Sequence, residues 1–97
     1  MADLLSDEQI SAFLDEHKRW ERDGDAIKAT FEFEDFNESL GFVTRVGLKA
    51  EAMFHHPDIE ISWDKVGLTL STHSEGGLTE MDTKLAAFCD EIVSNGE

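Results

Sequence analysis

The stretch AMFHHPDIEISWDKVGLTLSTH, residues 52–73, alternates apolar and polar residues on both sides of a short turn. The apolar residues before the turn are Ile59, Ile61 and Trp63, and those after it are Val66, Leu68 and Leu70. A period of two is typical of half-buried strands. The stretch therefore predicts a β-hairpin, and Asp64-Lys65 is its expected two-residue turn.

Three of the four histidines of the chain lie at the open end of this hairpin. The predicted register places His56 opposite His73, near enough for both imidazoles to contact one small planar ligand. Pro57 restricts His56 to extended conformations, which suits the mouth of a hairpin. Strand alternation is expected to keep His55 and His73 off the apolar faces. Histidine gives and takes protons near neutral pH, so the cluster favours acid–base catalysis; a zinc site held by three imidazoles is an alternative.

A second hairpin and a long helix are predicted before this stretch. Residues 20–34 alternate around Asp23-Gly24, a common two-residue turn, which would set Trp20 opposite Ile27. From Asp35 the apolar period changes to three and four, which predicts a helix of about twenty residues. Its expected buried stripe consists of Phe36, Leu40, Val43, Gly47, Ala50 and Phe54.

Amphipathic helices are also predicted at both ends of the chain. Ser6 is a suitable N-cap for the first helix, whose apolar face includes Ile10 and His17, and His17 has no expected role in the histidine site. Thr79 is a suitable N-cap for the last helix, which extends to Gly96.

The order helix, hairpin, helix, hairpin, helix predicts an α+β fold. We expect a single domain over residues 1–97, with a four-stranded antiparallel sheet and three helices packed on one face. A sheet of this size leaves exposed edges. These edges favour pairing between copies, so a homodimer or homotetramer is expected.

The composition excludes several classes of protein. The 97 residues are 40% hydrophobic and 31% charged, a balance typical of globular domains, and no apolar run approaches the roughly 18 residues of a membrane span. The net charge of -14 and the lack of a basic stripe disfavour nucleic acid as a partner. The N-terminus has no signal-peptide pattern, and the single Cys89 predicts no disulfide framework, so a cytoplasmic location is expected.

Two adjacent segments carry a resemblance to a known family. EAMFHHPDIEISWDKVGLTLSTH (residues 51–73), followed by GGLTEMD (76–82), resembles the pterin-4a-carbinolamine dehydratases. The shared pattern is an acidic residue, then His-His-Pro, an aromatic residue near the turn, Lys-Val, a strand ending in Thr-His, and Gly-Leu-Thr before an Asp. Trp63 and Asp64 stand where the family often has Tyr-Asn, and Phe54 occupies a position that is often polar.

The resemblance implies an activity and a set of site residues. Members of the family dehydrate 4a-hydroxytetrahydrobiopterin, a pterin 4a-carbinolamine, to quinonoid dihydropterin in tetrahydropterin recycling, without a metal or redox cofactor. The implied catalytic residues are His55, His56 and His73, with His55 and His73 as the acid–base pair. The implied substrate-binding residues are Glu51, Trp63, Ser71, Thr72 and Asp82. Of these, Glu51 is expected to orient an imidazole and Asp82 to act near His73.

An alternative function comes from a different class. Animal relatives in this family bind a transcription factor as its dimerisation cofactor, so the chain is also considered as a protein-binding module. The three histidines favour the enzyme.

Overall fold

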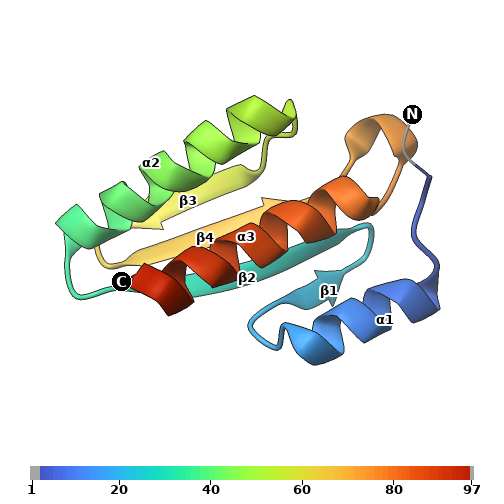
Figure 1. The fold of residues 1–97 in the computed structure, drawn as a ribbon, viewed down its shortest axis with the longest axis horizontal. Helices are drawn as coiled ribbons and strands as arrows, with labels where there is room; N and C mark the ends of the chain where they lie inside the picture. Colours follow the sequence, from blue (N-terminus) through green and yellow to red (C-terminus); the bar gives the residue numbers. More distant parts are fainter. Residues whose placement is uncertain (1–2, 97) are drawn as a thin grey trace.

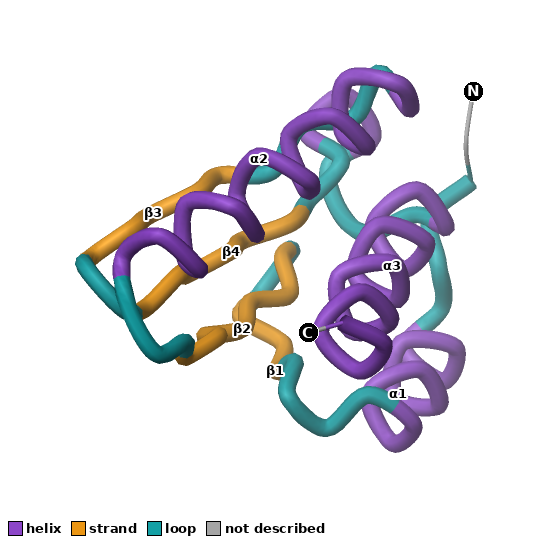
Figure 2. Tube along the Cα trace, turned by 60° about the vertical axis from the view of Figure 1, so that its left-hand side comes forward, coloured by secondary structure: helices purple, strands orange, loops and turns teal. Residues whose placement is uncertain are grey.

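Four antiparallel strands form one sheet in the order β1-β2-β4-β3, and the helices lie on one of its faces (Figure 1, Figure 2). The structure is a computed structural model that describes residues 3–96, with the side chains of residues 3–93. The elements are α1 (Asp7–Glu16), β1 (Glu21–Asp23), β2 (Ala26–Glu32), α2 (Phe36–Met53), β3 (Asp58–Ser62), β4 (Lys65–Leu70), the 3-10 helix η1 (His73–Glu75) and α3 (Glu80–Gly96). The predicted α+β fold and its element order are confirmed, with η1 as an addition. None of the helices in the described residues is long and apolar enough to cross a membrane.

The core lies between the helices and the two inner strands of the sheet, β2 and β4. The alternation predicted for these strands is confirmed, because their apolar residues are buried: Ile27, Ala29, Phe31, Val66, Leu68 and Leu70. In both views α2 runs along the β3 and β4 side of the sheet, α3 lies beside α2, and α1 lies next to β1 (Figure 1, Figure 2). One face of the sheet is therefore covered by helices.

The turn of the second hairpin differs from the predicted one. It is formed by Trp63-Asp64, one residue earlier than expected, and Ile61 pairs with Val66. Trp63 has a φ of 52°, in the left-handed region that large side chains rarely adopt. The register is shifted by two residues. Because that shift is even, the same side chains still share each face of the sheet.

The turn of the first hairpin is also displaced by one residue. Gly24-Asp25 connects β1 to β2, and Arg22 pairs with Ile27, so the predicted pairing of Trp20 with Ile27 is wrong. Gly24 has a φ of 63°, which glycine adopts without steric cost. Trp20 is nevertheless buried in the core.

Helix α2 buries a different stripe from the predicted one. Its buried side chains are Ser39, Phe42, Val46 and Ala50. Of the predicted stripe only Ala50 is buried, whereas Phe36, Leu40 and Phe54 are 47%, 47% and 85% exposed. The apolar residues of this helix cover two adjacent faces, and the rest of the fold packs on only one of them. The other face carries Phe36, Leu40 and Phe54, which we call the outer α2 stripe.

Both predicted N-caps are confirmed by their hydrogen bonds. The Ser6 hydroxyl accepts from the Gln9 amide, and the Gln9 side chain accepts from the Ser6 amide in return. At α3 the Thr79 hydroxyl accepts from the Met81 amide at 3.2 Å, and the Asp82 carboxylate accepts from the Thr79 amide at 2.9 Å. Asp82 thus caps the first turn of α3.

Candidate active site

The end of α2 sets the positions of the two adjacent histidines. Phe54 ends the helix in the left-handed conformation, with a φ of 55°, and its amide donates to the Glu51 carbonyl. The next amide, that of His55, donates to the Ala50 carbonyl at 3.0 Å. This cap reverses the chain, so that His56 and Pro57 lead directly into β3.

His55 forms a hydrogen bond with Asp82, the residue that also caps α3. Its Nε2 lies 2.6 Å from Asp82 Oδ1, and the two side chains are 10% and 0% exposed. Asp82 Oδ2 accepts two more hydrogen bonds, from the Thr72 hydroxyl at 2.7 Å and from the Thr79 amide at 2.9 Å. A carboxylate that accepts this many bonds is suited to the ionised, acceptor-only form. His55 therefore donates through Nε2, and Nδ1 is its second ring nitrogen.

His56 is held by a second carboxylate in a very different setting. Its Nε2 lies 2.8 Å from Glu51 Oε1, and these side chains are 60% and 74% exposed. The sequence predicted that Glu51 orients an imidazole, and the structure shows that this imidazole belongs to His56. Here too Nδ1 is the second ring nitrogen.

His56 and His73 line the same cavity, which has a volume of about 340 Å³. Its other lining residues are Asp23, Asp25, Ala26, Asp58, Thr69, Ser71 and Gly76. The volume falls at the low end of the roughly 300–1,000 Å³ typical of small-molecule sites. We take this histidine cavity as the candidate active site.

The predicted convergence of His56 and His73 holds, although the predicted ladder does not. With the observed register, extending the β3–β4 pairing would set His56 opposite Ser71 rather than His73. His73 reaches the cavity as the first residue of η1, where the chain has left the strand. His55 is not one of the lining residues; it is nearly buried, so the expectation that it stays outside the packed interior is wrong.

The predicted substrate-binding residues fall into three groups. Ser71 lines the cavity, and its hydroxyl donates to the Asp25 carbonyl at 2.8 Å. Thr72 and Asp82 are not among the lining residues: the Thr72 hydroxyl donates to Asp82, and Asp82 bonds to His55 and not to the His73 region as expected. Trp63 is a correction: it lies in the turn at the far end of β3, five residues from Asp58 and thus roughly 16 Å along the strand. The structure does not bring Trp63 to the histidines.

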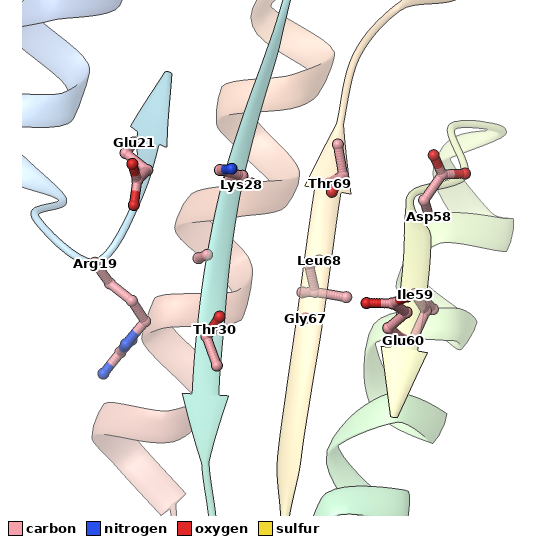
Figure 3. Close-up of a pocket in the computed structure, with 11 residues that line it drawn as sticks. Arg19, Glu21, Lys28, Thr30, Asp58, Ile59, Glu60, Gly67, Leu68 and Thr69 are labelled. Carbon is pink, nitrogen blue, oxygen red and sulfur yellow. The ribbon is translucent and has the colours of Figure 1, made fainter. Parts of the chain in front are cut away.

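A wider hollow on the outer face of the sheet adjoins this cavity (Figure 3). Its volume is about 680 Å³, and Asp58 and Thr69 line both spaces. Figure 3 shows Arg19 and Lys28 on one side of it and Asp58 and Glu60 on the other. No histidine lines this hollow among the described residues, so the acid–base chemistry is assigned to the smaller cavity.

The metal-site alternative and the fourth histidine, His17, remain to be placed. In the described residues no three His, Cys, Asp or Glu side chains are arranged to hold a metal ion. His17 stacks on Phe13 and lies 3.0 Å from its carbonyl oxygen through Nδ1, in α1 and away from the cavity lining.

Comparison with known proteins gives the family. The chain matches the family described as pterin 4 alpha carbinolamine dehydratase over residues 3–92. The chain belongs to this family. The family resemblance predicted from the sequence is therefore confirmed, and the family is one of hydro-lyases, as predicted.

Relatives of this dehydratase family match nearly the full chain. A protein of Roseiflexus castenholzii, provisionally named a pterin-4-alpha-carbinolamine dehydratase, is 48% identical over 96% of this chain and 100% of its own length. A protein of Natronomonas pharaonis with the same provisional name is 46% identical over 96% of this chain and 99% of its own length.

Two solved structures share the fold. One is described as a transcriptional coactivator/pterin dehydratase from Brucella melitensis, with a TM-score of 0.89 and 34% identity, covering 93% of this chain and 98% of that chain. The other is a pterin dehydratase-like protein described as a RuBisCO assembly factor in the alpha-carboxysome. Its TM-score is 0.64 at 20% identity, covering 80% of this chain and 90% of that chain, and the likeness shows the fold alone.

The sequence did not single out one wall of the cavity. Asp23 and Asp25 line it from the β1–β2 turn, and Gly76 lines it from the end of η1. The Asp-Gly turn was recognised, but nothing in the sequence pattern showed that this turn lies against the histidines, because β2 pairs with β4 only through tertiary contacts.

Proposed function

We propose that this chain dehydrates pterin 4a-carbinolamine (4a-hydroxytetrahydrobiopterin) to quinonoid dihydropterin and water, using His55, His56 and His73. The supporting observation is the histidine cavity, where His56 and His73 line one small space. The role in tetrahydropterin recycling is part of the proposal. So are the treatment of residues 1–97 as one domain and a cytoplasmic location, in which Cys89 stays reduced.

The reaction needs one proton delivered and one removed. The hydroxyl on C4a leaves as water when it is protonated, and the proton on N5 must be taken up as the C4a–N5 double bond forms. A histidine near neutral pH serves either purpose. We propose His56 and His73 as the pair that acts on the substrate, since both line the cavity, in place of the expected pair of His55 and His73.

The carboxylates are proposed to prepare two of the imidazoles. Glu51 holds His56 Nε2, so Nδ1 of that ring takes or gives the proton. Asp82 holds His55 in the same way from a buried position, and His55, which does not line the cavity, is proposed to position the adjacent His56. In the described residues no side-chain hydrogen bond restrains His73, which leaves its ring free to turn toward either hydroxyl epimer.

The test is a set of alanine variants assayed on enzymatically generated 4a-carbinolamine. Replacing His56 or His73 should slow dehydration by about 10- to 1,000-fold, and the double variant should approach the uncatalysed rate. His17→Ala is the matched control and should dehydrate at the parent rate. If the double variant is folded by thermal melting and still dehydrates at the parent rate, the proposed mechanism is wrong.

A chelator separates the proposal from a zinc enzyme. Activity should survive incubation with a strong chelator, because the imidazoles are proposed to move protons and no cofactor is required. Loss of activity on chelation, with recovery on added zinc, would favour the three-histidine metal site instead.

A homodimer or homotetramer is also proposed, and one observation supports it. The outer α2 stripe is exposed, and α2 packs beside the edge strand β3, whose Ile59 and Ile61 are each 37% exposed. Exposed apolar surface next to an unpaired strand edge is typical of an interface. Light scattering after size exclusion tests this: Leu40→Asp should lower the mass of the particle toward that of one chain.

The same surface supports a second candidate function, that of a protein-binding module. The Brucella melitensis structure is described both as a coactivator and as a dehydratase. A module that binds another protein through the outer α2 stripe would keep that binding in the folded His56→Ala/His73→Ala variant, whereas the enzyme would not keep its activity.

A further inference from the structure

We propose that Asp25 determines the specificity of the histidine cavity for a 2-amino-4-oxopteridine, by accepting hydrogen bonds from N3–H and the 2-amino group of the ring. Asp25 lies on the β1–β2 turn, outside the segments that carry the family pattern. The inference rests on the proposed function, and it adds the residue that distinguishes a pterin from related bicyclic rings.

The β1–β2 turn forms a wall of the cavity opposite the α2 end. Asp23, Asp25 and Ala26 line the cavity from this turn, while His56 and His73 line it from the end of α2 and from η1. The Ser71 hydroxyl donates to the Asp25 carbonyl at 2.8 Å and so ties the turn to the strand that leads to His73. The position of Asp25 relative to the histidines is therefore built into the fold.

Among the three carboxylates of the cavity, those of Asp23, Asp25 and Asp58, the geometry favours Asp25 for binding the ring edge opposite the histidines. Asp58 follows His56 by two residues, at the start of β3, and so lies on the histidine side of the cavity. Asp23 already lies 3.6 Å from Lys28 Nζ. In the described residues the Asp25 carboxylate has neither a salt bridge nor a hydrogen bond, since the bond from Ser71 goes to its backbone oxygen. Among the residues that the structure describes, no lysine or arginine lines the cavity, so its surroundings favour a ligand edge rich in N–H donors over an anionic one.

A pterin presents such an edge. Its N3–H and 2-amino N–H point in the same direction, as the two N–H groups of a guanidinium do, and a carboxylate accepts such a pair through both oxygens. With this edge on Asp25, the opposite part of the bicyclic ring, which carries C4a and N5, extends toward the histidine wall. A lumazine, which has a carbonyl in place of the 2-amino group, would bring an acceptor against the carboxylate.

The experiment compares two stable ligands on three proteins. The ligands are 7,8-dihydrobiopterin and the matching dihydrolumazine, and their binding is measured by calorimetry on the parent protein, on Asp25→Asn and on Glu21→Gln. Glu21→Gln removes a carboxylate from the same hairpin that does not line the cavity. The parent and the Glu21→Gln control should prefer the dihydropterin by about 10- to 100-fold, the range expected for a lost charge-assisted hydrogen bond.

In Asp25→Asn the preference should fall to within about threefold, because an amide can donate to the lumazine carbonyl and loses one acceptor for the pterin. For dehydration, KM should rise about 10-fold or more while kcat changes less than about threefold, because Asp25 is proposed to bind the part of the ring that does not react. Ser71→Ala, which frees the turn, should weaken the same preference by a smaller factor.

The outcomes separate this inference from the proposed function. If the parent dehydrates the carbinolamine and Asp25→Asn keeps the parent preference and KM, Asp25 has no such role. If the parent prefers the dihydropterin through Asp25 but dehydrates nothing, the inference stands and the proposed activity is wrong. A parent protein that binds neither ligand overturns both. Thermal melts show whether Asp25→Asn is folded, and Ser71→Ala provides a second variant if it is not.

Discussion

Two neighbouring histidines, His55 and His56, are each held by a carboxylate through Nε2, yet one pair is buried and the other is exposed. The Nε2 to oxygen distances are similar, 2.6 Å for His55 with Asp82 and 2.8 Å for His56 with Glu51. The exposed fractions differ greatly, at 10% and 0% against 60% and 74%. The contact distance alone therefore does not show how much each pair contributes to the stability of the fold.

The difference follows from what replaces the contact when it is lost. An exposed pair exchanges its hydrogen bond for water, so it contributes roughly 0–1 kcal/mol. A buried polar group that loses its partner cannot form a replacement hydrogen bond with water, so the free-energy cost of its desolvation is uncompensated. The buried pair should matter for folding and for the position of His55, and the exposed pair should matter only for the chemistry of His56.

The largest expected effect is that of Asp82→Ala. It removes the acceptor of three hydrogen bonds, from His55, Thr72 and the Thr79 amide. The free energy of unfolding should fall by about 3–5 kcal/mol, and Tm by more than about 10 °C. Chemical denaturation measures this. A loss below about 1 kcal/mol would show that burial does not distinguish the two pairs.

The second effect compares His55→Ala with His56→Ala. The first leaves buried Asp82 without one donor, so we expect a loss of stability of about 1–3 kcal/mol. The second removes an exposed side chain, and its loss should stay within about 0.5 kcal/mol. Thermal and denaturant melts of the two variants, measured side by side, test the contrast. Equal losses would contradict it.

The third effect concerns Cys89, a buried titratable group without an ionic partner. Burial, and then the nearby Asp90 charge, raises the pKa of its thiol to about 12. The unfolded thiol ionises near its ordinary pKa of 9.0, whereas the folded one does not. Its contribution to stability is therefore complete below pH 9 and is lost as the pH rises toward 12, by up to about 1.4 kcal/mol per pH unit.

The pH dependence of Cys89→Ala is the control for this prediction. Between pH 9 and 11 the variant should lose stability with pH less steeply than the parent, whatever its stability at neutral pH. Parallel slopes would show that the folded thiol ionises normally.

The smallest effect on stability is that of Glu51→Gln, which neutralises the exposed carboxylate. The free energy of unfolding should change by less than about 0.5 kcal/mol, since exposed pairs contribute little. Dehydration should slow modestly, because an amide oxygen is a weaker acceptor for the Nε2–H of His56 than a carboxylate oxygen. An unchanged rate of dehydration would remove Glu51 from the preparation of His56.

The sequence was sufficient for the element order, for the buried faces of β2 and β4, and for the convergence of His56 and His73 on one cavity. The alternation of Val66, Leu68 and Leu70 with their neighbours, and the switch of period after Asp35, are strong signals because burial on one face demands them. The His-His-Pro and Thr-His segments carried the family resemblance.

The exact positions of the two hairpin turns could not be predicted from the sequence. Asp23-Gly24-Asp25 allows glycine at either central position of a two-residue turn, and packing of the strands decided between them. No propensity rule anticipates Trp63 at positive φ. Likewise the apolar residues of α2 span two faces, and only the docked structure shows that Phe42 and Val46 point into the core while Phe36 and Leu40 do not.

Asp82 joins two tasks in one side chain, since it caps the first turn of α3 and holds His55. Any fluctuation that frays this turn also releases the imidazole, so local unfolding and loss of His55 alignment are one cooperative event. The amide hydrogen of Thr79, which bonds to Asp82, should therefore exchange with solvent at the rate at which the buried half of the site opens. The exchange rate of this amide would therefore measure how often His55 loses its alignment, without any substrate present.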